Sequence, residues 1–323
     1  MKKIIGLVVC ACLTICLVSC GENESKTVTG SLEEAFDTSA TIEETVLVDS
    51  NGIKITAKDL TYSDYSADVN IEIVNNSGKS ISVHANTLGY SWNSVNGIMI
   101  EDGYIGCDIP NGETAVDKVS FDYSQLEANG IKTLADIEIG FDISDSEYND
   151  IYKGIAKIET SEKNSYDYEK NYYQDTISSD NFSNKYDYKI EKFETDTIFD
   201  VSNIKVISET VIVNQDEDPI LFLELVNGTD KDYNISASNI YINDRLVEEY
   251  VWDSNNVRAG KKSIFDFDLA LLLESTDIDV SNINKISDVK FTIEINDAKT
   301  YSKVYSGELE IAIPNVPVTI EEN

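Results

Sequence analysis

The sequence is poor in basic side chains. Its 323 residues hold 25 Lys+Arg against 59 Asp+Glu, a formal net charge of −34, and Arg245 and Arg258 are its two arginines. A nucleic-acid-binding protein needs a basic surface to neutralise phosphates, and electrostatic docking on anionic lipid needs basic clusters. The composition therefore excludes nucleic acid as a partner and excludes charge-driven attachment to a membrane surface.

Histidine is almost absent, which limits the chemistry. A Ser-His hydrolase would have to assemble its nucleophile and orienting acid around His84, and the chain has no G-x-S-x-G motif. A zinc site takes three or four His, Cys or acidic ligands, and no such spacing occurs. His84 alternates with apolar neighbours, which predicts an exposed histidine on a strand. We expect no catalytic residue and no metal centre, and hence a protein that is not an enzyme.

Cysteine is also scarce, because Cys107 is the sole cysteine after residue 20. Cys107 shares strand parity with Ile105 and Ile109, and its charged neighbours are acidic. A reactive thiol needs a cationic neighbour to lower its pKa. The pattern predicts a buried structural thiol, and it leaves no partner for an intramolecular disulfide in an exported chain.

No apolar run is long enough for a membrane span. The longest, Ile4–Val18, has 15 residues behind two lysines, whereas a spanning helix needs about 20. Its length and basic start are typical of a secretory signal.

The run ends in Leu17, Val18, Ser19 and Cys20, a tetrad that resembles the lipobox of bacterial lipoproteins. The resemblance implies cleavage before Cys20, a diacylglyceryl group on its sulfur, and retention at the extracytoplasmic face of the bacterial cell membrane. The alternative is an ordinary signal peptide with an incidental cysteine. Loss of residues 1–19, with their two lysines, would bring the charge to −34 − 2 = −36.

Residues 20–43 are small, polar and acidic, and they predict a flexible tether. An alternative is a short helix begun by the S-x-x-E spacing from Ser31 to Glu34. Beyond the tether, apolar residues alternate with polar ones, as in strands with one buried face, and no long helical period occurs. The clearest examples are Val69–Ile73, Ile137–Ile143, Leu221–Leu225 and Val289–Ile295.

The strand pattern occurs twice. Residues 45–56 match 197–208, 71–86 match 223–238, and 134–143 match 286–295, with separations of 151 to 152 residues. In each copy a glycine turn (Gly112, Gly260) precedes an alternating strand, and a short stretch that predicts one turn of helix follows it. Frequent strands with short turns and no long crossovers predict antiparallel β-sandwiches.

The matched segments resemble the immunoglobulin-like domains of uncharacterised lipoproteins of Gram-positive bacteria. That resemblance implies an all-β fold with two tandem immunoglobulin-like sandwiches, and it carries no catalytic residue. The predicted organisation is a signal peptide (1–19), a flexible tether (20–43), a first sandwich (44–160), a tyrosine-rich linker (161–195), a second sandwich (196–313) and a C-terminal tail (314–323).

Aromatic side chains supply the candidate ligand contacts, because Tyr and Trp are enriched at binding surfaces. For the tyrosines, packing against the domain ends is the favoured interpretation, and for the tryptophans a partly buried packing role is favoured over ligand contact. These candidates are Tyr166, Tyr168, Tyr172, Tyr173, Trp92 and Trp252.

Asn214, Asp216 and Asp218 have the first spacings of a calcium loop, but Pro219 and Leu225 replace the glycine and glutamate that an EF-hand needs. A weak Ca²⁺ site and a simple turn both remain open. No pair of carboxylates stands out among 59 acids as a hydrolase pair.

The sequence therefore favours a lipid-anchored, non-catalytic surface module that binds a glycan or protein. The alternatives are a structural spacer or accessory subunit of an envelope complex, and, less favoured, a hydrolase with an acidic pair. We expect no cofactor beyond the lipid on Cys20 and a possible weakly bound Ca²⁺.

Overall fold

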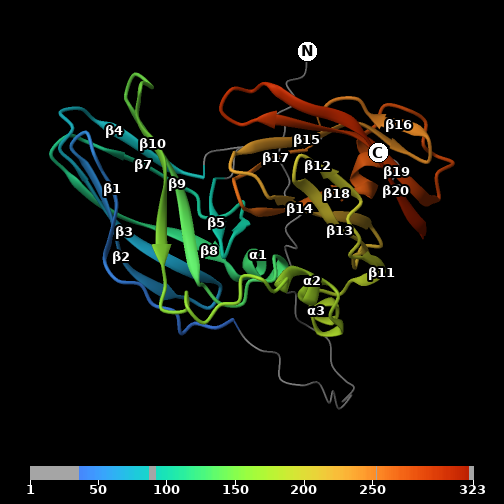
Figure 1. Ribbon diagram of the computed structural model, residues 1–323, viewed down its shortest axis with the longest axis horizontal. Coiled ribbons are helices and arrows are strands. Elements are labelled where there is room, and N and C mark those ends of the chain that lie inside the picture. The colour runs from blue at the N-terminus through green and yellow to red at the C-terminus, as the bar shows by residue number, and fades with distance from the viewer. Residues whose placement is uncertain (1–35, 87–91, 252, 320–323) are drawn as a thin grey trace, which may run out of the picture.

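A computed structural model describes residues 36–86, 92–251 and 253–319. The described chain is all-β in character, with two antiparallel β-sandwiches, as the sequence predicted (Figure 1). Each sandwich encloses its own hydrophobic core, built from the alternating residues of its strands. Val69, Ile71 and Ile73 are all fully buried, for example.

The first sandwich has one sheet in the order β1-β2-β3-β8 and a second in the order β7-β4-β9-β10. A small β5–β6 hairpin joins the second sheet through β9. The elements are β1 (Thr45–Ser50), β2 (Ile53–Tyr62), β3 (Ser66–Asn75), β4 (Ile81–Ala85), β5 (Ser94–Val95), β6 (Ile98–Met99), β7 (Ile105–Ile109), β8 (Thr114–Asp122), α1 (Tyr123–Ala128), β9 (Asp136–Asp145) and β10 (Asp150–Glu159).

The second sandwich repeats this order, as β12-β13-β14-β18 and β17-β15-β19-β20. Strand β16 adds to β15 at the edge. The elements are β12 (Phe199–Val201), β13 (Ile204–Val213), β14 (Pro219–Asn227), β15 (Tyr233–Ile242), β16 (Arg245–Glu248), β17 (Asp253–Val257), β18 (Lys262–Asp268), α4 (Leu269–Ser275), β19 (Lys285–Asp297) and β20 (Lys303–Pro317).

The repeat extends to individual hydrogen bonds. Asn75 donates from Nδ2 to the carbonyls of Lys79 and Ile109, each at 2.8 Å, and Asn227 donates in the same way to Lys231 and Val257. Both asparagines are fully buried at the end of a strand. The predicted glycine turns also occur, with φ of +82° at Gly112 and +69° at Gly260. One turn of helix, α1 or α4, follows each, as the sequence predicted.

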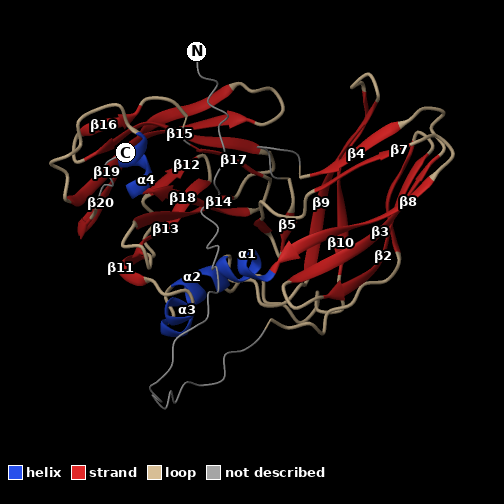
Figure 2. Ribbon diagram, turned by 180° about the vertical axis from the view of Figure 1, so that it is seen from behind, coloured by secondary structure: helices blue, strands red, loops and turns tan. Residues whose placement is uncertain are grey.

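The two sandwiches share a sheet. The second sheet of the first sandwich continues through β5 and β6 into β18, where Lys262 pairs with Ile98 in parallel register. Met99 of β6 is packed into the core of the second sandwich. Figure 1 and Figure 2 show the sandwiches side by side with α1, α2 and α3 gathered at their junction. The sandwiches are therefore docked, not strung on a flexible linker.

Two predicted boundaries need correction. Residues 36–43 are not part of a tether, because Phe36 and Ala40 are buried in the first core and Phe36 stacks on Tyr123 at 4.4 Å. The tail from 314 is also packed, since β20 runs to Pro317 and Val316 is buried. Residues 161–195 fold into helices and a strand. Residues 1–35, including the predicted signal and Cys20, lie outside the described residues.

Candidate functional site

Residues 161–195, here called the tyrosine-rich segment, form the junction between the sandwiches. They fold into α2 (Tyr172–Ile177), α3 (Asp180–Lys185) and β11 (Lys189–Glu194), which pairs with β13. The helices begin where the sequence offers caps: Asn171 accepts the Gln174 N–H at 3.2 Å and Ser179 accepts the Phe182 N–H at 3.1 Å. Helices this short are marginal alone, so their packing must hold them.

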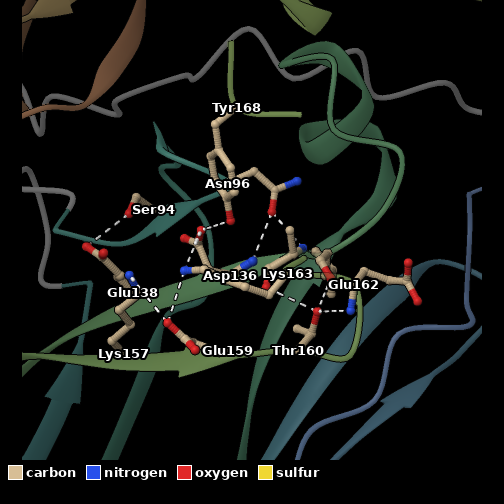
Figure 3. Close-up of polar contacts among 12 residues, drawn as sticks. Ser94, Asn96, Asp136, Glu138, Lys157, Glu159, Thr160, Glu162, Lys163 and Tyr168 are labelled. Carbon is tan, nitrogen blue, oxygen red and sulfur yellow. Dashed lines mark hydrogen bonds and ion pairs between the residues drawn. The ribbon is translucent and has the colours of Figure 1, made fainter. Parts of the chain in front are cut away.

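Polar contacts fix the start of the segment to the first sandwich (Figure 3). The Tyr168 hydroxyl donates to the carboxylate of Asp136 on β9. Lys163 lies 3.0 Å from the Glu159 carboxylate and 4.0 Å from that of Asp136. Burial and the bond to Asp136 raise the pKa of Tyr168, so this tyrosine is held as a neutral donor.

The middle of the segment rests on α1. Lys185 and the Tyr186 hydroxyl both donate to the Glu127 carboxylate at 2.8 Å. Gly130 follows α1 with φ of +75°, and a Cβ there would lie 2.5 Å from the carbonyl carbon of Tyr172. The backbone of α2 can approach so closely only because residue 130 is glycine.

The second sandwich holds the segment through a buried carboxylate. Glu224 on β14 is fully buried. It accepts hydrogen bonds from Asn171 and Gln174 at 2.8 Å, from Ser208 at 3.1 Å and from Lys262 at 3.2 Å. A charge removed from water needs such full pairing, and these bonds also orient the first turn of α2.

A second buried cluster joins the sandwiches directly. Arg258 Nη1 lies 2.6 Å from the carboxylate of Glu138, Lys261 lies 2.8 Å from it, and Arg258 Nη2 donates to Ser94 at 2.7 Å. Burial alone would raise the pKa of Glu138, but the hydrogen bond from Lys261 and the charge of Arg258 outweigh it and lower that pKa. Arg258, one of the two arginines of the chain, thus joins the two sandwiches through a buried ion pair.

An open groove of about 590 Å³ lies beside α2 and α3. Tyr166 and Tyr172 line it with ring centroids 4.9 Å apart, and the Lys170 ammonium sits 4.8 Å over the Tyr172 ring. Lys170 is also paired with Asp175 at 3.1 Å. Lys132 at the groove wall is exposed and forms no ion pair with any residue that the structure describes. The groove therefore combines aromatic faces with an available ammonium group.

The predicted contact residues separate into three groups. Tyr166, Tyr168 and Tyr172 form one cluster of edge-to-face and tilted rings at or beside the groove. Tyr173 is buried on the other side of α2. Trp92 is half-buried against Gly140 of β9, in a packing role. Trp252 lies outside the described residues. The five candidates that the structure describes therefore do not converge on one surface.

The calcium candidate folds as a self-bonded turn. Asn214 Oδ1 accepts the backbone N–H groups of Asp216 at 2.9 Å and Asp218 at 2.8 Å. Such bonds are typical of an Asx turn. In the part of the chain that the structure describes, no group of three His, Cys, Asp or Glu residues is arranged to hold a metal ion.

His84 is half-buried on β4, opposite Gly106 and Asp142 of the neighbouring strands, so it is less exposed than predicted. Cys107 packs half-buried against the first core, and burial raises its thiol pKa to about 11. The described residues contain no helix long and apolar enough to cross a bilayer.

The sequence pattern did not predict the charged residues that join the two sandwiches. Glu138, Glu224 and Arg258 sit in strands or turns among many other charges. The scarcity of arginine was the available signal for Arg258, since a rare, bidentate cation is often used for a buried pair.

No protein-family model and no curated protein matches the chain. Among solved structures, the chain is similar to a GH2 β-galacturonidase from Eisenbergiella tayi bound to galacturonate, at 10% identity and a TM-score of 0.21. The match covers 78% of this chain and 36% of that one, so the chain spans about a third of that enzyme's length.

Proposed function

We propose that the protein is a non-catalytic binding module that takes a surface glycan or protein segment into the groove beside α2 and α3. The observation that carries this proposal is the groove itself, whose walls hold Tyr166, Tyr172 and Lys132, a lysine without an ion-pair partner among the described residues. Flat rings stack on sugar rings or anchor peptide side chains, and one ammonium can bond hydroxyl or carboxylate groups.

Rigidity supports this proposal. The shared sheet, the Glu138–Arg258 cluster and the bonds to Glu224 leave little freedom at the junction. A groove whose walls are already ordered loses less conformational entropy when a ligand binds. The strong negative charge elsewhere keeps the chain soluble and repels anionic polymers, so the groove favours neutral glycans or mixed-charge peptides.

Binding is tested by screening the full-length protein, in detergent, against a panel of bacterial surface glycans and secreted peptides. Lys132→Ala and Tyr172→Ser should each weaken a saturable interaction about tenfold or more. Lys54→Ala is the matched control, because Lys54 is an exposed lysine on β2 that forms no ion pair with a described residue. Capture of an integral membrane complex that ignores both groove changes would favour the accessory-subunit alternative. No capture at all would leave the spacer alternative.

We further propose that a lipid on Cys20 holds the module at the extracytoplasmic face of the cell membrane. The support is the tetrad of residues 17–20 after a short apolar run. Cys20→Ala should move the protein from the detergent phase to the aqueous phase and remove the lipid mass from the N-terminal peptide. Cys16→Ala, four residues earlier, is the matched control and should change neither. Unchanged partitioning of the Cys20 variant would refute the anchor.

A further inference from the structure

A second hollow lies behind the tyrosine-rich segment, between α1–α3 and the outer face of the sheet β13-β14-β18. It has a volume of about 160 Å³. Figure 2 shows the three helices beside this sheet. Phe222 and Asp266, directly opposite each other on β14 and β18, are half-buried, so the cavity reaches solvent.

The cavity wall is unusually aromatic. Phe182 stands 4.5 Å from Tyr186 and 6.0 Å from Tyr188, measured between ring centroids, and Tyr173 and Phe222 complete the wall. Aromatic faces carry negative electrostatic potential and attract a cation within about 6 Å. The Tyr186 ring already contacts one cation, because the Lys185 ammonium lies 5.3 Å from its centroid.

The charged groups at the cavity are acidic. Asp266 and Glu101 both line it, and the described lining includes no Lys, Arg or His. The two carboxylates are close enough to repel, and burial with the charges of Glu101 and Asp268 raises the pKa of Asp266 to about 6. At neutral pH Asp266 is thus an ionised group held at an energetic cost, which a bound cation would relieve.

A buried polar group at the wall points to a ligand with its own polar atom. Asn256 is 4% exposed, and its Nδ2 has no hydrogen-bond partner among the described residues, whereas its Oδ1 accepts from Asn234 at 3.4 Å. An unsatisfied buried polar group is rare in a folded protein and calls for an explanation such as a bound ion or water.

We propose that this cavity binds a small organic cation that carries a methylated ammonium group and a hydroxyl or carbonyl oxygen. The ammonium sits among the rings near Asp266, and the oxygen accepts from Asn256 Nδ2. A metal ion fits less well, because no group of three His, Cys, Asp or Glu residues in the described structure is arranged to hold one. The inference goes beyond the proposed function: Phe182 of α3 borders both hollows, but Asn256 and Asp266 line the cavity alone and Lys132 lines the groove alone.

The test is calorimetric titration of the full-length protein with choline at pH 7.5. The neutral analogue, in which carbon replaces the nitrogen, is titrated in parallel. We expect saturable choline binding, binding of the neutral analogue at least about tenfold weaker, and a similar loss of choline affinity in Asp266→Asn. Asp49→Asn, at an exposed carboxylate on β1, is the matched control and should bind as the wild type does.

Absence of saturable binding up to about 10 mM choline would overturn the proposal. So would equal affinity for the neutral analogue, which would show an apolar cavity alone. Phe222→Leu, which keeps the cavity wall apolar but removes a ring, should also weaken choline binding, and unchanged affinity there would argue against the rings. Lys132→Ala should leave choline binding intact, so failure of this site and failure of the groove are separate results.

Discussion

Replacing Asp266 with asparagine is expected to stabilise the protein, by an amount that depends on pH. The side chain keeps its size and its position opposite Phe222, but it no longer ionises next to Glu101 and Asp268. Because burial and those two acids raise the pKa of Asp266, the native fold favours the protonated carboxyl.

The magnitude follows from the raised pKa. A rise from 3.8 to about 6 corresponds to about 3 kcal/mol, at about 1.4 kcal/mol for each tenfold change in acidity. Asp266 keeps some contact with solvent, which screens its charge, so we expect about 1–2 kcal/mol. A carboxyl whose pKa is raised by folding destabilises the native state as pH rises from the unfolded value, near 3.8, through the native value, near 6. Above that range the full penalty applies.

The assay is urea unfolding of the wild type, Asp266→Asn and the control Asp49→Asn at constant ionic strength, from about pH 5 to pH 8. The gain of Asp266→Asn over the wild type should grow between about pH 5 and 6.5 and then stay constant. A gain that is the same at every pH, or a loss of stability above about pH 7, would refute the reasoning. Asp49→Asn should show no pH-dependent difference.

Three further results are expected. Gly130→Ala should lower the free energy of unfolding by about 2–4 kcal/mol and speed amide exchange across residues 161–195. The control Gly112→Ala, with a similar φ but open space around the new Cβ, should lower it by about 1 kcal/mol. Equal losses would show that the close approach of α2 is not the cause. Asn75→Ala and Asn227→Ala should each cost about 2–3 kcal/mol in chemical unfolding, because each deletes the same set of buried bonds; strongly unequal losses would contradict the repeat. Cys107 should react with a thiol reagent at pH 8 far more slowly in the native state than in urea, given its pKa of about 11; rapid native labelling would show an accessible thiolate.

Strand alternation and the repeat predicted the sandwiches well. Period-two patterns such as Ile137–Ile143 depend on local geometry, and each fell on a buried strand face. The constant spacing of the copies predicted a shared topology, and the equivalent bonds of Asn75 and Asn227 show how closely it is kept. These features could be predicted from the sequence because they repeat within the chain itself.

The junction could not be predicted in the same way. The sequence predicts a tyrosine-rich linker at residues 161–195 and favours packing of its tyrosines against the domain ends, but the order of the segment comes from contacts with distant partners that the sequence does not identify. Tyr168 bonds an acid 32 residues earlier, and Asn171 bonds Glu224, 53 residues later. Arg258 and Ser94 meet across 164 residues. Pairings of this kind are set by the docked surfaces, which no local pattern encodes.

The same contacts explain why the tyrosine-rich segment can carry binding sites at all. Helices of six residues, such as α2 and α3, would not persist alone, yet here they are held by Glu127 and Gly130 of the α1 region and by Glu224 of β14. Fixing them creates two differently lined hollows, a groove with an open lysine and an acidic aromatic cavity. Loosening the junction should therefore weaken ligand binding at both hollows together, while a change confined to Lys132 or Asp266 should weaken one and spare the other.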